Sequence, residues 1–479
     1  MLDYEKALEN LWSTDLCDKI IGEEINSMFD NDVPYFSFIS DATVLYGKDN
    51  TILAHSNVTS YNYFLDKLNS LSAEKIEHQI NLIRMSFTKY DDVKVKNIPI
   101  IDLYKNKLSN KNKKIVMEEL LREYIDKKLP LDKTITWFAL ISDRLGNETY
   151  TLASNYFYDG LSGVALTFYY TYSLTKNNEY LDIYTKIITG LIEYYGFKRL
   201  DSIGYTKALS VLYMIAYLPT CEIESSKFEE YINTITDTSF LEKQDITHLD
   251  LLNGVIGLVR CFIQLYHKTN RIDFLQKAIE YINIFEEKEG SSMEVFTNGF
   301  GHGYISVALC FIEIYKITKA DKYLKYFEKY YKLANVKSEL NNCNLSWCKG
   351  LIGEAVGRIR IISILNECGI DSKNFEIDLS NLHHTIEQST LLSSDCLCHG
   401  NAAISEYYMI RYENFHNICD LNIASSILEN ICTNYLKNGE FMLKQYGDVK
   451  PIGLFDGEFG IIYSILRYFS NCENPSVLY

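Results

Sequence analysis

The sequence predicts an all-α protein built as a double ring of helices, an α/α toroid of about seven helical-hairpin repeats, preceded by a small mixed α/β N-terminal region. Short glycine-bearing turns recur about every 50 residues, a period that fits two helices and their turns. Each turn precedes a run that is apolar on nearly every side, which is typical of a buried helix. The runs between them, such as Asp321–Leu333, are amphipathic, as expected of an outer layer.

The composition fits a large folded protein and excludes several classes. Of 479 residues, 47% are hydrophobic and 23% charged, which predicts a sizeable buried core. Because the net charge is −16, we expect no nucleic-acid partner. The N-terminus lacks the pattern of a secretory signal, and no apolar stretch approaches the roughly 20 residues of a membrane span. We therefore expect a cytoplasmic protein whose 12 cysteines are mostly reduced thiols.

Residues 1–103 form a region apart from the repeats. Helical patterns around Asp3–Asn31 and Ala73–Thr88 flank a more extended piece, Val33–Leu45. The chain then passes through residues 104–130, which we assign to a linker and a helix.

That connecting stretch has two parts. Residues 104–114 are polar and basic, and they fit either a linker or the solvated end of a helix. A helical segment follows at Ile115–Leu129.

Residues 131–479 are assigned to the toroid. Two extended runs, Thr134–Ser142 and Thr149–Ser154, are separated by Asp-Arg-Leu-Gly-Asn and predict a hairpin. The repeats then follow, each marked by a turn glycine: Gly160, Gly204, Gly254, Gly303, Gly350, Gly400 and Gly457. The expected inner helices include Val164–Leu174, Leu209–Leu218, Leu258–Tyr266, Ile305–Tyr315 and Ile461–Phe469.

If these helices close into a ring, one end of the ring becomes the expected place of the functional site. An open solenoid is the alternative, but the inner helices are too apolar to line an exposed concave face. In a closed ring the turns gather at one end of the inner helices. Residues beside the turns then converge although they are far apart in sequence.

Four turn-borne residues can bind metal or move protons: Cys348, Cys398, His399 and His302. Two thiolates and one imidazole suit Zn²⁺. Three protein ligands leave a fourth tetrahedral position for water or substrate, as in catalytic zinc sites. His302 lies between two glycines, where a packed core histidine is unexpected, although it could also cap a helix or act as a fourth ligand.

Other interpretations of these residues stay open. A cytosolic cysteine is usually a small buried hydrophobe. A closed structural site of Cys343, Cys348, Cys396 and Cys398 is a second alternative, which leaves His399 without a role. Asp250, four residues before Gly254, could orient a histidine or a substrate amide, or simply cap a helix.

The turn motifs match a known family. From about residue 130 to 479 the chain resembles the LanC-like lanthionine cyclase domain of class II lanthipeptide synthetases, the LanM type. The matching stretches are Tyr158–Gly163 (YDGLSG), Gly299–Gly303 (GFGHG), Ser346–Gly350 (SWCKG), Cys396–Asn401 (CLCHGN) and Gly453–Gly457 (GLFDG).

The N-terminal region resembles the same enzymes. Asp32–Phe36 and Lys75–Arg84 look like the tail of their dehydratase domain. The phosphorylation and elimination machinery of that domain would lie upstream, so dehydratase activity is not expected from this chain alone. The resemblance implies either a fragment of a longer synthetase or a shortened cyclase.

The resemblance also implies roles for individual residues. It carries zinc ligation onto Cys348, Cys398 and His399, an acid–base role onto His302, and an accompanying carboxylate onto Asp250. Some members have an Arg four residues before the first zinc Cys and a Tyr directly after it. Here these positions are Asn344 and Lys349, so the role of the Arg does not transfer.

The implied function is a zinc-dependent lanthionine and methyllanthionine cyclase, a carbon–sulfur lyase of lantibiotic biosynthesis. It would add cysteine thiolates of a dehydrated precursor peptide to dehydroalanine or dehydrobutyrine by Michael addition, with His302 as the acid for the enolate or the base for the thiol. The resemblance also implies two further partners: a dehydratase, as an upstream domain or a separate protein, and an export transporter. The expected location is the bacterial cytoplasm, with membrane association through those partners.

Two other functions are considered. One is a non-catalytic zinc-bearing helical toroid that binds and presents a precursor peptide. The other is a helical-toroid glycosidase with paired acids, for which Asp250 and Glu354 could be nominated.

Overall fold

The computed structural model forms two compact units, Met1–Phe87 and Thr88–Tyr479. The boundaries expected from sequence, after residues 103 and 130, stay predictions. The described residues are 19–20, 22–24, 27, 33, 35–55, 57–69, 71–73, 76, 99–103, 110–131, 134–142, 148–195, 203–207, 209–237, 248–289, 296–338, 344–443 and 450–479. The helices predicted around Asp3–Asn31 and Ala73–Thr88, and the linker at 104–109, lie mostly or wholly outside them.

The N-terminal unit contains a small antiparallel sheet in the order β1-β2-β3. Its core brings together Ile20, Leu45 and Leu53. The described elements are β1 (Ser37–Phe38), β2 (Val44–Tyr46), the short 3₁₀ helix η1 (Lys48–Asn50), β3 (Ile52–His55) and α3 (Ser60–Asn69).

The second unit begins with short elements before the ring. The predicted hairpin is confirmed, because Phe138 pairs with Leu152 and Ser142 with Glu148 in antiparallel register. These elements are α5 (Ile100–Leu103), α6 (Lys111–Lys127), β4 (Leu129–Pro130), β5 (Ile135–Thr136), β6 (Phe138–Ser142) and β7 (Glu148–Leu152).

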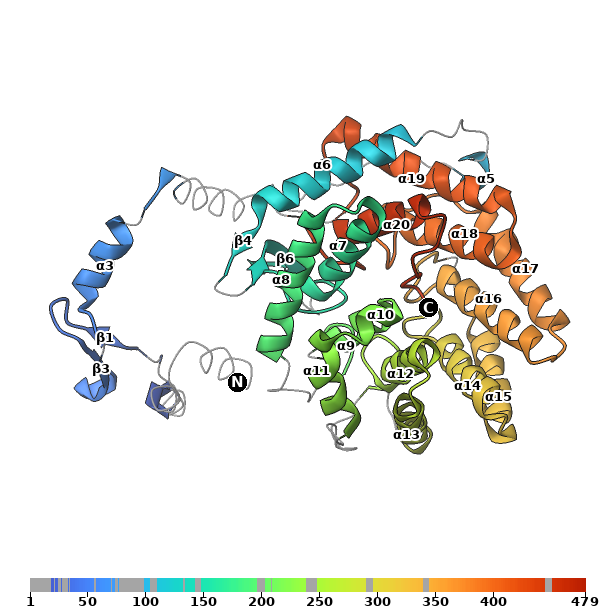
Figure 1. The fold of residues 1–479 in the computed structure, drawn as a ribbon, viewed down its shortest axis with the longest axis horizontal. Coiled ribbons are helices and arrows are strands. Elements are labelled where there is room, and N and C mark those ends of the chain that lie inside the picture. The colour runs from blue at the N-terminus through green and yellow to red at the C-terminus, as the bar shows by residue number, and fades with distance from the viewer. Residues whose placement is uncertain are drawn as a thin grey trace. The chain divides into compact units, whose positions relative to one another are not determined.

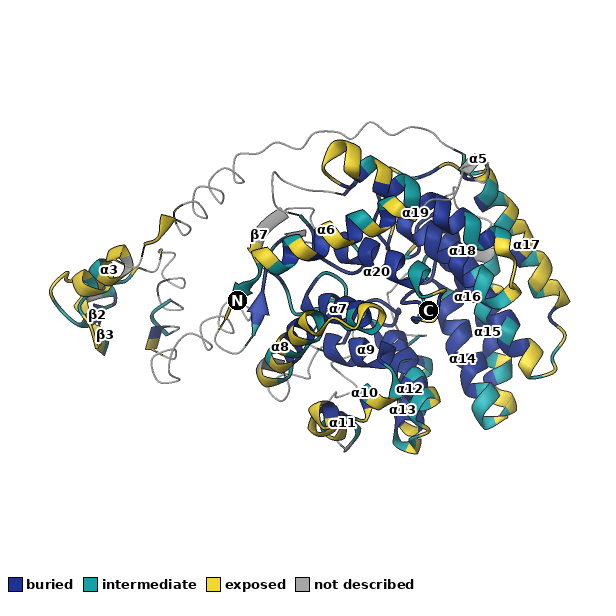
Figure 2. Ribbon diagram, turned by 45° about the horizontal axis from the view of Figure 1, so that its top comes forward, coloured by how far each residue is buried: buried dark blue, intermediate teal, exposed yellow. Residues whose placement is uncertain are grey.

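Seven helices of the described residues form the inner ring (Figure 1). Each inner helix contacts the inner helix that follows it in the sequence, and the last inner helix, α20, contacts the first, α7. The ring is therefore closed and is not an open solenoid. Their side chains are buried on nearly every side, and Figure 2 shows α14, α16 and α18 almost wholly in the buried colour. The inner helices are α7 (Leu161–Thr175), α9 (Ser210–Tyr217), α12 (Val255–Thr269), α14 (Tyr304–Thr318), α16 (Leu351–Glu367), α18 (Asn401–Phe415) and α20 (Glu458–Phe469).

An outer layer of amphipathic helices covers this ring, which confirms the predicted double ring. α8 packs on α7, α13 on α12, α15 on α14, α17 on α16 and α19 on α18, while α11 contacts α13. These helices and the short α10 are α8 (Asn178–Tyr195), α10 (Thr220–Ile223), α11 (Ser226–Asp237), α13 (Ile272–Glu289), α15 (Asp321–Ser338), α17 (Lys373–Gln388) and α19 (Ile418–Asn438). None of the helices in the described ranges combines the length and the apolar character that a bilayer span requires.

Helix α6, which precedes the repeats in the sequence, completes the outer layer beside the last repeats. It packs against α19 and α20 and buries Val116, Leu120 and Leu121 there. Trp137 fixes its C-terminal turn, because the indole Nε1–H donates to the carbonyl of Tyr124 at 2.7 Å. The sequence analysis grouped this helix with the linker, whereas the structure places it beside the last inner helix.

A glycine precedes the first residue of six inner helices, at Gly160, Gly254, Gly303, Gly350, Gly400 and Gly457. These residues have extended backbone angles, and close backbone approach is what requires glycine. A Cβ on Gly350 would stand 2.1 Å from the carbonyl oxygen of Asn344. The remaining marker, Gly204, has a φ of +122° and lies in the loop before α9.

Backbone hydrogen bonds link the seven turns into a closed circle. Each turn donates an N–H to a carbonyl of the following turn, and the last turn donates to the first. The bonds are Tyr158 N to Tyr205 O (3.0 Å), Tyr205 N to Leu252 O (2.8 Å), Leu252 N to Gly301 O (3.2 Å), Phe300 N to Trp347 O (2.9 Å), Trp347 N to Cys398 O (2.8 Å), Cys398 N to Phe455 O (2.8 Å) and Phe455 N to Tyr158 O (2.9 Å). The turns therefore do converge at one end of the ring.

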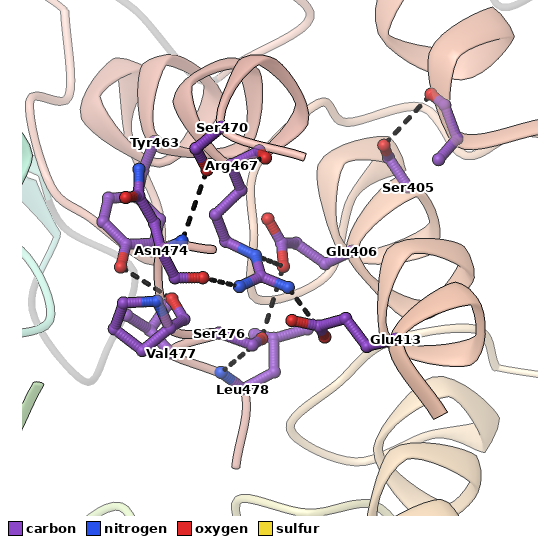
Figure 3. A network of polar contacts seen from close by, with 12 residues as sticks. Ser405, Glu406, Glu413, Tyr463, Arg467, Ser470, Asn474, Ser476, Val477 and Leu478 are labelled. Carbon is purple, nitrogen blue, oxygen red and sulfur yellow. Dashed lines mark hydrogen bonds and ion pairs between the residues drawn. The ribbon is translucent and has the colours of Figure 1, made fainter. Parts of the chain in front are cut away.

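The segment after α20 returns into the ring and is anchored by one arginine (Figure 3). Arg467 Nε donates to Glu406 at 2.8 Å, Nη2 donates to Glu413 at 3.1 Å, and Nη1 donates to the carbonyl of Asn474. Arg467 and Glu406 are fully buried, so each satisfies the charge of the other. The segment 475–479 then contacts α9 and α12 inside the ring.

Candidate active site at the glycine turns

Four consecutive turns carry the residues predicted from sequence. Asp250 precedes α12, His302 precedes α14, Cys348 precedes α16, and the pair Cys398–His399 precedes α18. The backbone circle places these turns side by side: His302 N donates to Cys348 O at 3.1 Å, in addition to the bonds given above. All five residues therefore lie at the same end of the inner ring.

The thiols of Cys348 and Cys398 form a hydrogen-bonded pair. Cys398 is 2% exposed, whereas Cys348 is partly exposed. The pKa of Cys348 is lowered to about 6, first because Cys398 donates a hydrogen bond to its thiolate, and further because His302 and His399 lie nearby. The same bond raises the pKa of Cys398. Near neutral pH the pair therefore carries one thiolate and one thiol.

Tyr158 is a neighbour of this pair that the sequence analysis did not single out. Its phenol forms a hydrogen bond with Cys398, and its ring stacks on Phe455 with the centroids 5.2 Å apart. The pKa of Tyr158 is raised, first by burial and then by the charges of Cys398, Asp456 and Cys348. The phenol is thus a stable hydrogen-bond donor beside the thiols. Its position two residues before Gly160, inside the first turn motif, is the signal that could have identified it.

His302 and Asp250 form the second pair of the site. Nδ1 of His302 lies 2.5 Å from Oδ2 of Asp250. The other oxygen, Oδ1, accepts the backbone N–H of Asn253 at 2.7 Å. Asp250 therefore both orients the histidine and fixes its own turn, so the two roles considered for it are filled together. The carboxylate is 5% exposed and the imidazole 22% exposed, which leaves the ring reachable from outside.

The donor chemistry of Cys348, Cys398 and His399 fits zinc, because thiolate and imidazole are the ligands that zinc prefers. The two thiols are in contact, and His399, which is exposed, lies near enough to Cys348 to lower its pKa. In the described ranges, however, no three His, Cys, Asp or Glu side chains are gathered closely enough to form a metal cluster. The fit therefore rests on the donor set and its neighbourhood, and zinc ligation remains a proposal.

The described residues do not support the alternative four-cysteine site. Cys343 lies outside them. Cys396 is 1% exposed, and its sulfur accepts the backbone N–H of His399 at 3.5 Å and the hydroxyl of Ser394 at 3.4 Å. Burial raises the pKa of its thiol. Cys396 thus behaves as a packed thiol that stabilises the turn.

Three further residues were named from the sequence: Asn344, Lys349 and Glu354. Asn344 accepts the backbone N–H of Ser346 at 2.8 Å and shapes the turn, while Lys349 is exposed. Glu354 is fully buried in α16, where it accepts the backbone N–H of Gly299 at 3.2 Å and pairs with Arg358 at 3.4 Å. Burial raises the pKa of Glu354 to about 6. A carboxylate committed in this way does not suit the paired acids of a glycosidase.

Comparison with known proteins identifies the family of the chain. The family model for lanthionine synthetase C-like proteins matches residues 152–479. One curated relative, the lacticin 481/lactococcin biosynthesis protein LcnDR2 of Lactococcus lactis subsp. lactis, is 24% identical over 535 aligned residues. The alignment covers 99% of this chain and 54% of LcnDR2, so the chain spans about half the length of that relative.

The solved structures that match the chain have low sequence identity to it and TM-scores below 0.5. Nisin cyclase matches with a TM-score of 0.49 and 13% identity, over 75% of this chain and 93% of the cyclase. A variant of unsaturated glucuronyl hydrolase from Streptococcus agalactiae matches with a TM-score of 0.39 and 9% identity, over 82% of this chain and 100% of the hydrolase.

Proposed function

Because the chain belongs to the lanthionine synthetase C-like family, we propose that it closes thioether rings in a lanthipeptide precursor whose Ser and Thr residues have been dehydrated. In each ring a peptide cysteine adds to dehydroalanine or dehydrobutyrine and gives lanthionine or methyllanthionine. A precursor peptide as substrate agrees with the role of LcnDR2 as a lacticin 481/lactococcin biosynthesis protein.

This proposal rests on one observation: a pair of thiols and an oriented histidine lie together at one end of the ring. Cys348 and Cys398 provide a thiolate and a thiol in contact, and His302 with Asp250 provides an oriented imidazole in the adjoining turn. A conjugate addition of a thiol needs both a place that favours a thiolate and a group that moves a proton.

Zinc held by Cys348, Cys398 and His399 would favour the thiolate form of the peptide cysteine, because metal coordination lowers the pKa of a thiol. The chain's own residues supply the rest. In the zinc-bound form, where Cys398 would be a thiolate, the hydrogen bond from Tyr158 would stabilise its negative charge. Because Nδ1 of His302 is engaged by Asp250, Nε2 is the nitrogen left for proton transfer.

The addition balances as follows. The sulfur lone pair forms a bond to the β-carbon of the dehydro residue, and the C=C π pair moves toward the carbonyl as an enolate. The thiol proton passes from the sulfur to solvent water, and solvent water supplies the proton carried by Nε2 of His302. Nε2 of His302 delivers a proton to the α-carbon, which restores the saturated residue. Asp250 stabilises the protonated form of His302 during this transfer.

Zinc content and ring formation test the proposal together. Zinc per chain is measured by elemental mass spectrometry in wild type, Cys348→Ala, Cys398→Ala and His399→Ala. Cyclisation is followed on a synthetic peptide that contains one cysteine and one dehydroalanine, as the loss of alkylatable thiol at constant peptide mass. Cys396→Ala is the matched control, because its buried thiol bonds only to the turn.

We expect one zinc in wild type and in Cys396→Ala, and its loss together with cyclisation in the three ligand variants. His302→Ala should keep zinc and slow cyclisation. Normal cyclisation by a zinc-free Cys398→Ala protein would contradict the proposal. Zinc and peptide binding without loss of thiol in wild type would instead indicate a ring that only presents the peptide.

A further inference from the structure

A second cavity lies inside the ring, away from the glycine turns. It has a volume of about 240 Å³ and is lined by the C-terminal halves of α9, α12, α14 and α16 and by the segment 475–479. Each of the helices α12, α14 and α16 begins at its glycine turn, so their C-terminal halves lie toward the opposite end of the ring. The cavity is therefore separate from the candidate active site.

The lining of this cavity is strongly cationic although the chain carries a net charge of −16. It includes Arg260, Lys268, Lys316 and Arg360, and among the described lining residues Glu313 alone is acidic. His267 also lines the cavity, but burial lowers its pKa and favours its neutral form. Such a concentration of positive charge against the overall balance is what an anion site requires.

Ion pairs account for only part of this charge. Arg260 is paired with Glu313, and both are nearly fully buried. Lys316 is paired with Glu367, which lies outside the cavity lining and is 49% exposed, so this pair marks the side nearest the solvent. Arg360 shares the field of Glu367 with Lys316, and Lys268 forms no ion pair with any acidic side chain of the described residues.

Contacts with neutral groups hold these two cations in the cavity wall. Lys268 donates to the carbonyl of Leu218 at 2.7 Å, and burial lowers its pKa to about 8. The Arg360 guanidinium lies over the ring of Tyr479, 4.9 Å from its centroid. The backbone oxygen of Tyr479 lies in the same wall, where it accepts hydrogen bonds from Gln264 at 2.9 Å and from Tyr217 at 3.3 Å.

Helix-end electrostatics explain one of the two cations and not the other. A cation in the last turn of a helix complements the free carbonyl groups there, and Lys268, next to the last residue of α12, fits that description. Arg360 lies about two turns before the end of α16, beyond the range of this effect. A guanidinium and a half-buried ammonium in the lining of one cavity have the chemistry of an oxyanion site.

We propose that this cavity binds a small oxyanion, with phosphate or carboxylate groups, held by Arg360 and Lys268. The volume suits an ion of the size of phosphate or a small organic acid. Arg360 would supply two parallel N–H donors and Lys268 a single ammonium donor. An anion there supplies the counter-charge that the described side chains do not.

Bound anion would also stabilise the C-terminal segment. Pro475, Ser476 and Tyr479 form one wall of the cavity. The carbonyl of Leu478, in the same segment, accepts the indole N–H of Trp347 at 2.8 Å. Binding at the cavity therefore stabilises the same segment that packs against the turn of Cys348, and it should raise the unfolding temperature of the whole ring.

Isothermal titration calorimetry on the full chain tests this site. Sodium phosphate and sodium citrate are titrated separately at constant ionic strength with chloride as the background anion, which distinguishes a phosphate from a carboxylate ligand. Wild type should bind at least one of them saturably. Arg360→Gln should lower that affinity at least about tenfold, because a charge-assisted hydrogen bond is lost.

Two further variants keep the result interpretable. Arg122→Gln, the same change at an exposed position of α6, should bind as wild type does. Arg360→Lys keeps the charge without the planar fork, so it should fold and lose affinity severalfold. The proposal is overturned if wild type binds neither anion saturably, if Arg360→Gln and Arg122→Gln bind equally, or if Arg360→Lys binds as tightly as wild type.

Discussion

The substitution Asp250→Asn tests whether the carboxylate acts in catalysis or only shapes a turn. Its two oxygens serve three donors. Oδ2 meets Nδ1 of His302 at 2.5 Å and accepts the side-chain amide of Asn253 at 3.3 Å, and Oδ1 accepts the backbone N–H of Asn253 at 2.7 Å. Asparagine has one oxygen and one NH₂ group. If the oxygen stays on the N–H of Asn253, the NH₂ group faces Nδ1 of His302 and forces the hydrogen of the imidazole onto Nε2.

The expected cost follows from what the variant loses. The charge-assisted bond to His302 contributes about 1.5–3 kcal/mol. Asp250 is 5% exposed, so water screens this interaction little. If the loss falls on the proton-transfer step, the rate of cyclisation should drop about 10- to 100-fold.

The assay compares cyclisation of the dehydroalanine peptide by wild type, Asp250→Asn and a control, Asp182→Asn, at an exposed position of α8. Zinc content is measured in all three. We expect the rate to fall only in Asp250→Asn, with zinc content unchanged. A wild-type rate would show that Asp250 serves only the turn, and a loss of zinc would place its effect at the thiols instead.

Three further predictions concern stability and are measured by urea unfolding. Arg467→Met leaves the carboxylate of Glu406 buried and unpaired, so unfolding should become easier by about 3–5 kcal/mol; a loss under 1 kcal/mol would contradict this. Trp347→Phe removes the N–H that Leu478 accepts and should cost about 2 kcal/mol; unchanged stability would refute it. Burial raises the pKa of Glu354 to about 6 from its ordinary 4.5, so the folded chain holds this proton more tightly than the unfolded chain. Wild type should therefore gain up to about 2 kcal/mol over Glu354→Gln as the pH falls from 7 to 4.5, and a parallel pH dependence of the two proteins would contradict this.

The repeat pattern made the ring and much of the site predictable. A glycine turn before a helix that is apolar all round indicates both the helix and its burial, and closure then brings the turns together. For that reason Cys348, Cys398, His399 and His302 could be placed in one region from sequence. The contact of His302 with Asp250 could also be anticipated, because both residues lie in glycine turns.

Features outside the repeat could not be predicted in the same way. The amphipathic pattern of α6 gives a helix but no partner, and its packing against α20 joins segments more than 300 residues apart. The segment 470–479 has no period, and its place inside the ring depends on contacts with residues far away in the sequence, such as Trp347 with the carbonyl of Leu478 and Gln264 with Tyr479. Tyr158 was hidden because a tyrosine in a turn motif has no preferred role until its neighbours are known.

The circle of backbone hydrogen bonds explains why chemistry gathers at this end of the ring. Each turn both donates to the next turn and accepts from the one before it, so no turn can shift without lengthening two bonds. Asp250, His302, Cys348 and Cys398 lie in four successive turns of that circle. Their relative positions are therefore fixed by the backbone and not by the flexibility of separate loops, which is the preorganisation that proton transfer and thiolate chemistry require. Substitutions that widen a turn, such as an added Cβ on Gly350, should reduce activity even where they touch none of the four side chains.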